Sequence, residues 1–114
     1  MKALIMLVRI LGLASIVLGA LVWAEHVQLL SAHIGLGFLV SIAVFILAVV
    51  ALTKKAAVAG SLGVILALLL PVIGFLQLPV TFHSLRLIQI LHVIVGLCII
   101  GVAERLYSAI RSSK

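Results

Sequence analysis

The sequence has few charged residues, few aromatic residues, two prolines and a single cysteine. Only 9% of its 114 residues are charged and only two are acidic, whereas 67% are hydrophobic. A soluble domain of this length cannot bury so much apolar surface, so a lipid bilayer is the expected solvent. The lone Cys98 excludes an intramolecular disulfide and a cysteine-based metal motif.

The basic residues are scattered and form no run, although they give a formal net charge of +6. With few aromatic residues among them, they favour contact with anionic lipid headgroups over nucleic acid. A phosphate-binding loop and a nucleophile–base pattern are both missing, and Gly35-Leu36-Gly37 is too short and apolar for a nucleotide motif. These absences give no support for a complete enzyme.

Four long apolar segments are present, at 3–24, 28–52, 57–79 and 85–107. Each has about the 20 residues that a helix needs to cross a bilayer. The short connections force neighbours to run antiparallel, which predicts one all-α domain, an up-down-up-down bundle of four transmembrane helices. The first segment also resembles a secretory signal, and we interpret it as an uncleaved helix.

The distribution of lysine and arginine predicts how the bundle is oriented. All but one of the eight fall on the side of the chain termini, and Arg86 alone falls on the other side. The positive-inside rule then places both termini in the cytoplasm, in a multi-pass protein of the inner (plasma) membrane. Arg9 and Glu104 both fall near the inner boundary, where they can form an ion pair unless Arg9 reaches the headgroups instead.

All four histidines then belong to the outer half of the bundle. His26 and His83 lie in the outer connections, whereas His33 and His92 lie inside apolar segments, about 6–11 Å below the outer boundary. An ionisable side chain in a bilayer is costly and is kept mostly for function. Taken alone, each of these two histidines can also be interpreted as a structural residue that is packed and hydrogen-bonded, without a function of its own.

The two buried histidines begin similar pentapeptides, HIGLG at 33–37 and HVIVG at 92–96. Aligning residues 1–55 with residues 60–114 superimposes the two patterns. A parallel duplication about the membrane normal would explain this match.

The pattern is what a bis-histidine haem site requires, with His33 and His92 as axial iron ligands. In a square bundle the second and fourth helices are diagonal, at roughly 11–14 Å, a gap that two imidazoles and one iron can fill with bonds of about 2 Å. The porphyrin would stand between the first and third helices. Small residues on those two helices would make room for it: Gly12, Ser15, Gly19, Gly60, Gly63, Ala67 and Gly74.

Four further residues are candidates for contact with the cofactor or its ligands. Gly37 and Gly96 each follow a histidine by four positions on the same helix face, which would let a flat ring approach the backbone. Gln89 lies one turn before His92 and is a candidate to orient its ring. His26 is a candidate for a haem propionate or a second ligand. Glycines at such spacing are also ordinary helix-packing residues.

The stretch QILHVIVGLCIIGVAERL around His92, with His33 on the second helix, resembles one half of a heme A synthase. The resemblance implies a four-helix bundle that holds haem b through His33 and His92. That family has a glutamate three residues before its histidine, where this chain has Leu30, so oxidation of a haem methyl group is not implied. A looser similarity is to cytochromes of the b561 type.

The sequence therefore predicts a membrane haem b protein that transfers electrons or holds haem near the outer face. A quinone or another redox partner would exchange electrons with it, and a homodimer or a larger membrane complex would be its assembly. A small metal-ion or solute transporter and an accessory subunit of a larger membrane complex remain as alternatives.

Overall fold

The computed structural model describes residues 1–24, 26–77 and 86–112. The helices are α1 (Lys2–Trp23), α2 (Leu30–Thr53), α3 (Ala57–Leu76) and α4 (Arg86–Ser112), with a short 3-10 helix, η1 (Val27–Leu29), before α2. No strand occurs in these ranges. All four α-helices are long and apolar enough to cross a membrane. The predicted all-α fold with four such helices is confirmed.

The helix ends differ from the expected segments mainly in the second half of the chain. Helix α3 ends at Leu76, and the remaining expected positions 78–79 lie outside the described residues. Helix α4 continues past position 107 to Ser112. Hydropathy falls after Tyr107, but Ile110 is still buried against the bundle. The last turns of α4 are thus held by one apolar face.

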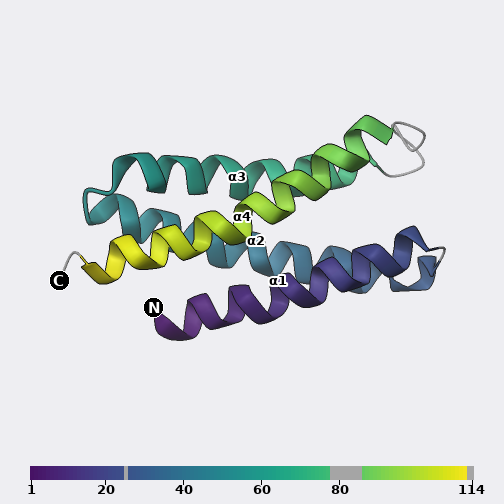
Figure 1. The fold of residues 1–114 in the computed structure, drawn as a ribbon, viewed down its shortest axis with the longest axis horizontal. Helices are drawn as coiled ribbons and strands as arrows, with labels where there is room; N and C mark the ends of the chain where they lie inside the picture. Colours follow the sequence, from purple (N-terminus) through teal and green to yellow (C-terminus); the bar gives the residue numbers. More distant parts are fainter. Residues whose placement is uncertain (25, 78–85, 113–114) are drawn as a thin grey trace.

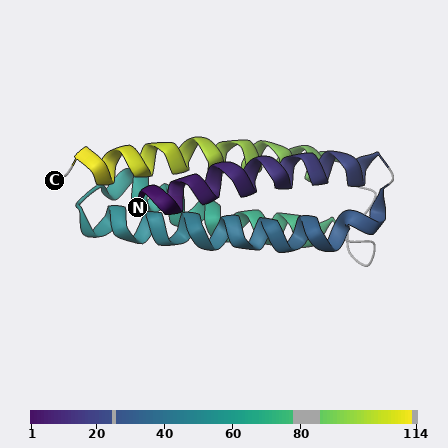
Figure 2. The same cartoon turned by 90° about the horizontal axis from the view of Figure 1, so that it is seen from below.

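The helices form a bundle in which α2 and α4 lie on the short diagonal. Helix α2 contacts α1, α3 and α4, whereas no Cα atom of α1 lies within 8 Å of α3. Figure 1 shows both termini at one end of the long axis, here called the termini end. The first turns of α2 and α4 lie at the opposite end, here called the histidine end, and Figure 2 shows the same arrangement from below.

The tightly packed core lies in the middle of the bundle and towards the termini end. In α2 the buried residues begin at Val40, ten positions after the helix starts at Leu30, and in α4 they begin at Val95. The largest fully buried side chains are those of Ile5, Val8, Val44, Leu47, Ile99 and Leu106. The histidine end of α2 and α4 consists of half-buried and exposed residues.

Helices α2 and α3 approach closely where α3 has glycine. A Cβ atom added at Gly60 would lie 2.6 Å from Cγ of Leu52 and 3.0 Å from the carbonyl oxygen of Ala48. One added at Gly63 would lie 2.9 Å from both Ala48 Cβ and Leu106 Cδ1. These glycines therefore bring the backbones together, as small residues commonly do between membrane helices.

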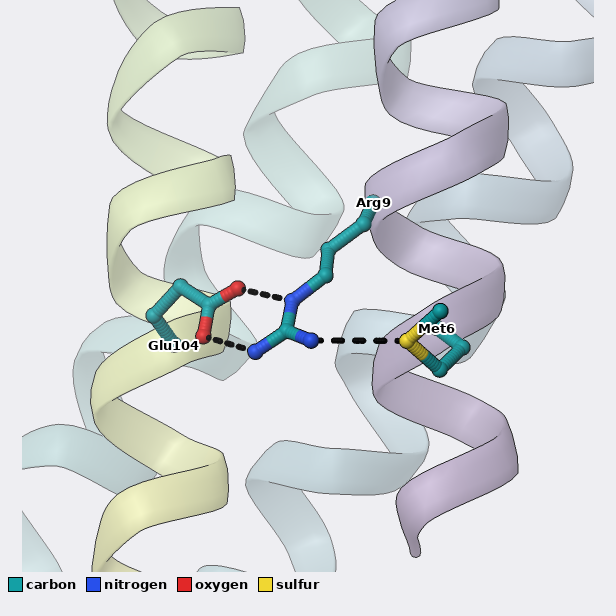
Figure 3. A network of polar contacts seen from close by, with 3 residues as sticks. All are labelled: Met6, Arg9 and Glu104. Atoms are coloured by element: carbon teal, nitrogen blue, oxygen red, sulfur yellow. Dashed lines mark hydrogen bonds and ion pairs between the residues drawn. The ribbon is translucent and has the colours of Figure 1, made fainter.

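An ion pair joins α1 to α4 on the surface of the bundle. Nε and Nη2 of Arg9 donate hydrogen bonds to the two carboxylate oxygens of Glu104, at 2.5 and 2.8 Å, and Nη1 lies 3.4 Å from Sδ of Met6 (Figure 3). Of the two outcomes that the sequence allowed for Arg9, the structure shows pairing with Glu104. The two-point geometry links the two helices at this position.

Candidate functional site

His33 lies in the first turn of α2, and its ring is held by α1. Its Nδ1 lies 2.8 Å from the backbone carbonyl oxygen of Ser15 and 3.3 Å from Ser15 Oγ. A carbonyl oxygen only accepts hydrogen bonds, so Nδ1 carries the proton and donates it. In the neutral tautomer with this proton, the lone pair is on Nε2, which is the form of histidine that binds a metal. Ser15 is itself buried.

His92 lies in the second turn of α4 and is half-buried. Its Nδ1 atom is buried and has no hydrogen-bond partner among the described residues. A buried polar atom without a partner costs free energy, and such an atom in a native protein calls for an explanation.

The two imidazoles meet across the short diagonal of the bundle. Their ring centroids are 6.1 Å apart and the ring planes are inclined at 75°. A metal ion bound by one nitrogen of each ring at about 2 Å would place the two ring centres on the order of 6 Å apart. The separation of His33 and His92 therefore fits a single metal ion between them, with the rings rotated relative to one another.

Glycines on α1 and α3 provide the space for the two rings. A Cβ atom at Gly19 would lie 2.8 Å from Cε1 of His33, and one at Gly74 would lie 3.2 Å from Cε1 of His92. Both distances are shorter than ordinary van der Waals contact. Gly19 and Gly74 were only two of several small residues in the sequence, and neither was singled out there as a contact of a histidine ring.

The other predicted site residues lie farther from the rings or make different contacts. A Cβ atom at Gly37 would approach Oγ of Ser15 at 3.9 Å, and one at Gly96 would approach Cδ1 of Leu70 at 4.0 Å, so each glycine faces a neighbouring helix with little crowding. Gln89 is half-buried, and no hydrogen bond joins it to His92 in the described part of the chain. His26 is exposed. His83 lies outside the described residues, as does Glu25, the neighbour of His26.

The donor set at this site consists of two imidazoles. Among residues 1–24, 26–77 and 86–112, no group of three or more histidine, cysteine or acidic side chains could hold a metal ion. A zinc ion takes four ligands in structural sites and three in catalytic ones, so two rings are a poor site for bare zinc. Haem iron has four porphyrin nitrogens already and needs only two axial ligands, which the two histidines can provide.

Comparison of the chain with protein-family models, with curated proteins and with solved structures gives no match.

Proposed function

We propose that this chain is a membrane protein that binds one haem b through His33 and His92 and that serves in electron transfer or in holding haem. The observation that carries the proposal is the approach of the two rings to 6.1 Å on helices that lie across the short diagonal. The macrocycle would stand along the longer diagonal, between α1 and α3, which have no Cα atoms within 8 Å of one another.

The proposal includes an orientation of the bundle. The chain crosses the membrane four times in an up-down-up-down arrangement, with both termini in the cytoplasm and the histidine end towards the outer side of the inner membrane. The bias of lysine and arginine towards the termini end supports this orientation. Electrons would then enter or leave near the outer face.

The residues around the proposed site have three tasks. His33 and His92 provide two neutral nitrogen donors, and the carbonyl oxygen of Ser15 holds His33 in the tautomer that leaves Nε2 free. Gly19 and Gly74 keep the space beside the rings clear of side-chain atoms. The apolar helices exclude water, and burial of this kind is one means by which a protein sets a reduction potential. Haem, when bound, would supply a one-electron iron couple.

The absorption spectrum of the protein tests the proposal directly. The full chain is produced in cells supplied with iron and a haem precursor, and is purified in a mild detergent. We expect about one haem b per chain, measured as its pyridine complex, with a Soret band that sharpens and shifts on addition of dithionite. The variants His33→Ala and His92→Ala should each lose the six-coordinate spectrum, because each lacks one axial ligand.

The matched control is Gly35→Ala, on the same helix as His33, where an added Cβ atom would meet nothing within 4 Å. Its spectrum should equal that of the wild-type chain. A colourless wild-type protein from haem-supplied cells would overturn the proposal. Bound zinc or another metal without porphyrin, found by metal analysis, would overturn it in favour of a metal transporter.

A further inference from the structure

The two histidines of the site are held in different ways. Nδ1 of His33 donates a hydrogen bond to the Ser15 carbonyl oxygen, at 2.8 Å, and the Ser15 hydroxyl lies 3.3 Å away. Nδ1 of His92 is buried with no hydrogen-bond partner among the described residues. A hydrogen bond therefore fixes the orientation and tautomer of the His33 ring, whereas no hydrogen bond within the described residues does so at Nδ1 of the His92 ring.

The glycines beside the two rings also differ, because the one beside His33 lies closer to its ring than the one beside His92 does. The ring of His33 lies so close to α1 that a Cβ atom at Gly19 would be 2.8 Å from its Cε1 atom. At Gly74 the corresponding distance to Cε1 of His92 is 3.2 Å, and the distance to Nδ1 is 3.7 Å. His33 is thus confined by a neighbouring helix more closely than His92 is.

This difference matters for metal binding, because a histidine that donates its second ring N–H to a carbonyl is a better-oriented and more basic ligand. Removing such a partner typically lowers metal affinity by about 10- to 100-fold. His33 has this partner in Ser15, whereas Nδ1 of His92 has none among the described residues. The two axial bonds of a metal between them are therefore expected to differ in strength.

We infer that His33 is the permanent axial ligand of the proposed haem and that His92 is exchangeable, so that a small uncharged ligand such as carbon monoxide can take its place on the reduced iron. This inference rests on the proposed function. The exchange is a substitution without electron transfer: the bond from iron to the His92 nitrogen breaks, and a bond from iron to the carbon of carbon monoxide forms. The apolar surroundings admit a neutral ligand more readily than a charged one.

Spectra of the dithionite-reduced protein with and without carbon monoxide test the inference. We expect the wild-type protein to bind the gas and to give the same Soret position in its complex as the His92→Ala variant, because both would retain His33 as the only protein ligand. We also expect His92→Ala to retain at least about tenfold more haem than His33→Ala at equal protein concentration.

Three results would overturn the inference. The wild-type spectrum could stay unchanged under saturating carbon monoxide; the wild-type complex could differ from that of His92→Ala; or the two alanine variants could lose haem equally. In each case a wild-type protein that binds haem b would leave the proposed function intact. A wild-type protein without haem would overturn both.

Failure of the His33→Ala variant to fold would not block the test. The comparison of the wild-type and His92→Ala complexes then decides it, because that comparison does not use the third variant. The Gly35→Ala protein serves again as the control and should match the wild-type chain in both haem content and carbon monoxide binding.

Discussion

Arg9 and Glu104, on the first and last helices, form a two-point ion pair at 2.5 and 2.8 Å on the surface of the bundle. Their side chains remain 46% and 42% exposed, so in a membrane this pair faces lipid or headgroups rather than the protein core. The pair thus links α1 to α4 through side chains, beside the apolar packing of Gly12 against Ile100.

We expect that a single charge of this pair, left without the other, lowers the stability of the bundle. Arg9→Met or Glu104→Gln leaves the other charge without its partner in an apolar environment, whereas the double variant leaves none. Thermal unfolding in detergent, followed by circular dichroism, should show each single variant melting several degrees below the double variant. Equal melting temperatures for all three proteins would show that the pair contributes nothing measurable.

Gly19→Ala should reduce haem binding without reducing helix stability. The added Cβ atom would lie 2.8 Å from Cε1 of His33, so the ring must move away from the Ser15 carbonyl oxygen. Alanine favours a helix over glycine by about 1 kcal/mol, so the helical signal should not fall. Haem content per chain should drop several-fold, measured against Gly35→Ala as the control. Full haem content in Gly19→Ala would contradict the described position of His33.

Gly63→Val should destabilise the bundle itself. The Cβ atom of the valine would lie 2.9 Å from Ala48 Cβ and from Leu106 Cδ1, at a point where α2, α3 and α4 meet. Overpacking of this kind costs about 1–3 kcal/mol, which should appear as unfolding at a lower fraction of a denaturing detergent. Gly101→Val is the control, because a Cβ atom there meets nothing within 4 Å.

The orientation can be tested with single cysteines in a Cys98→Ser background. Gln28→Cys and Lys55→Cys both occupy exposed positions, at the histidine end and the termini end respectively. We expect a membrane-impermeant thiol reagent added to intact cells to label Cys at 28 but not at 55, and the reverse in inside-out vesicles. Labelling in the opposite pattern would place the histidine site on the cytoplasmic side.

Much of the fold could be predicted from the sequence, because the length and hydropathy of an apolar segment together predict a membrane-spanning helix. The end of α4 was missed, since Ile110 is buried on one face among polar and charged residues that lower a hydropathy average. The meeting of His33 and His92 could be expected from their matched depth, because the connections fix which helices are diagonal.

The residues that contact the two histidine rings could not be predicted from the spacing of residues in the sequence. Which glycine lies beside a ring depends on the rotation of each helix and on its shift along the bundle axis, and both are set by packing. This is why Gly37 and Gly96, chosen by their spacing from the histidines, face other helices, whereas Gly19 and Gly74 lie against the rings. The carbonyl contact of Ser15 has no side-chain signature and leaves no trace in the sequence.

The uneven packing along the bundle has a consequence for biogenesis. The fully buried side chains lie in the middle and towards the termini end, so the four helices can associate stably before anything binds between the histidines. The proposed haem would accordingly enter late, after the four helices have assembled.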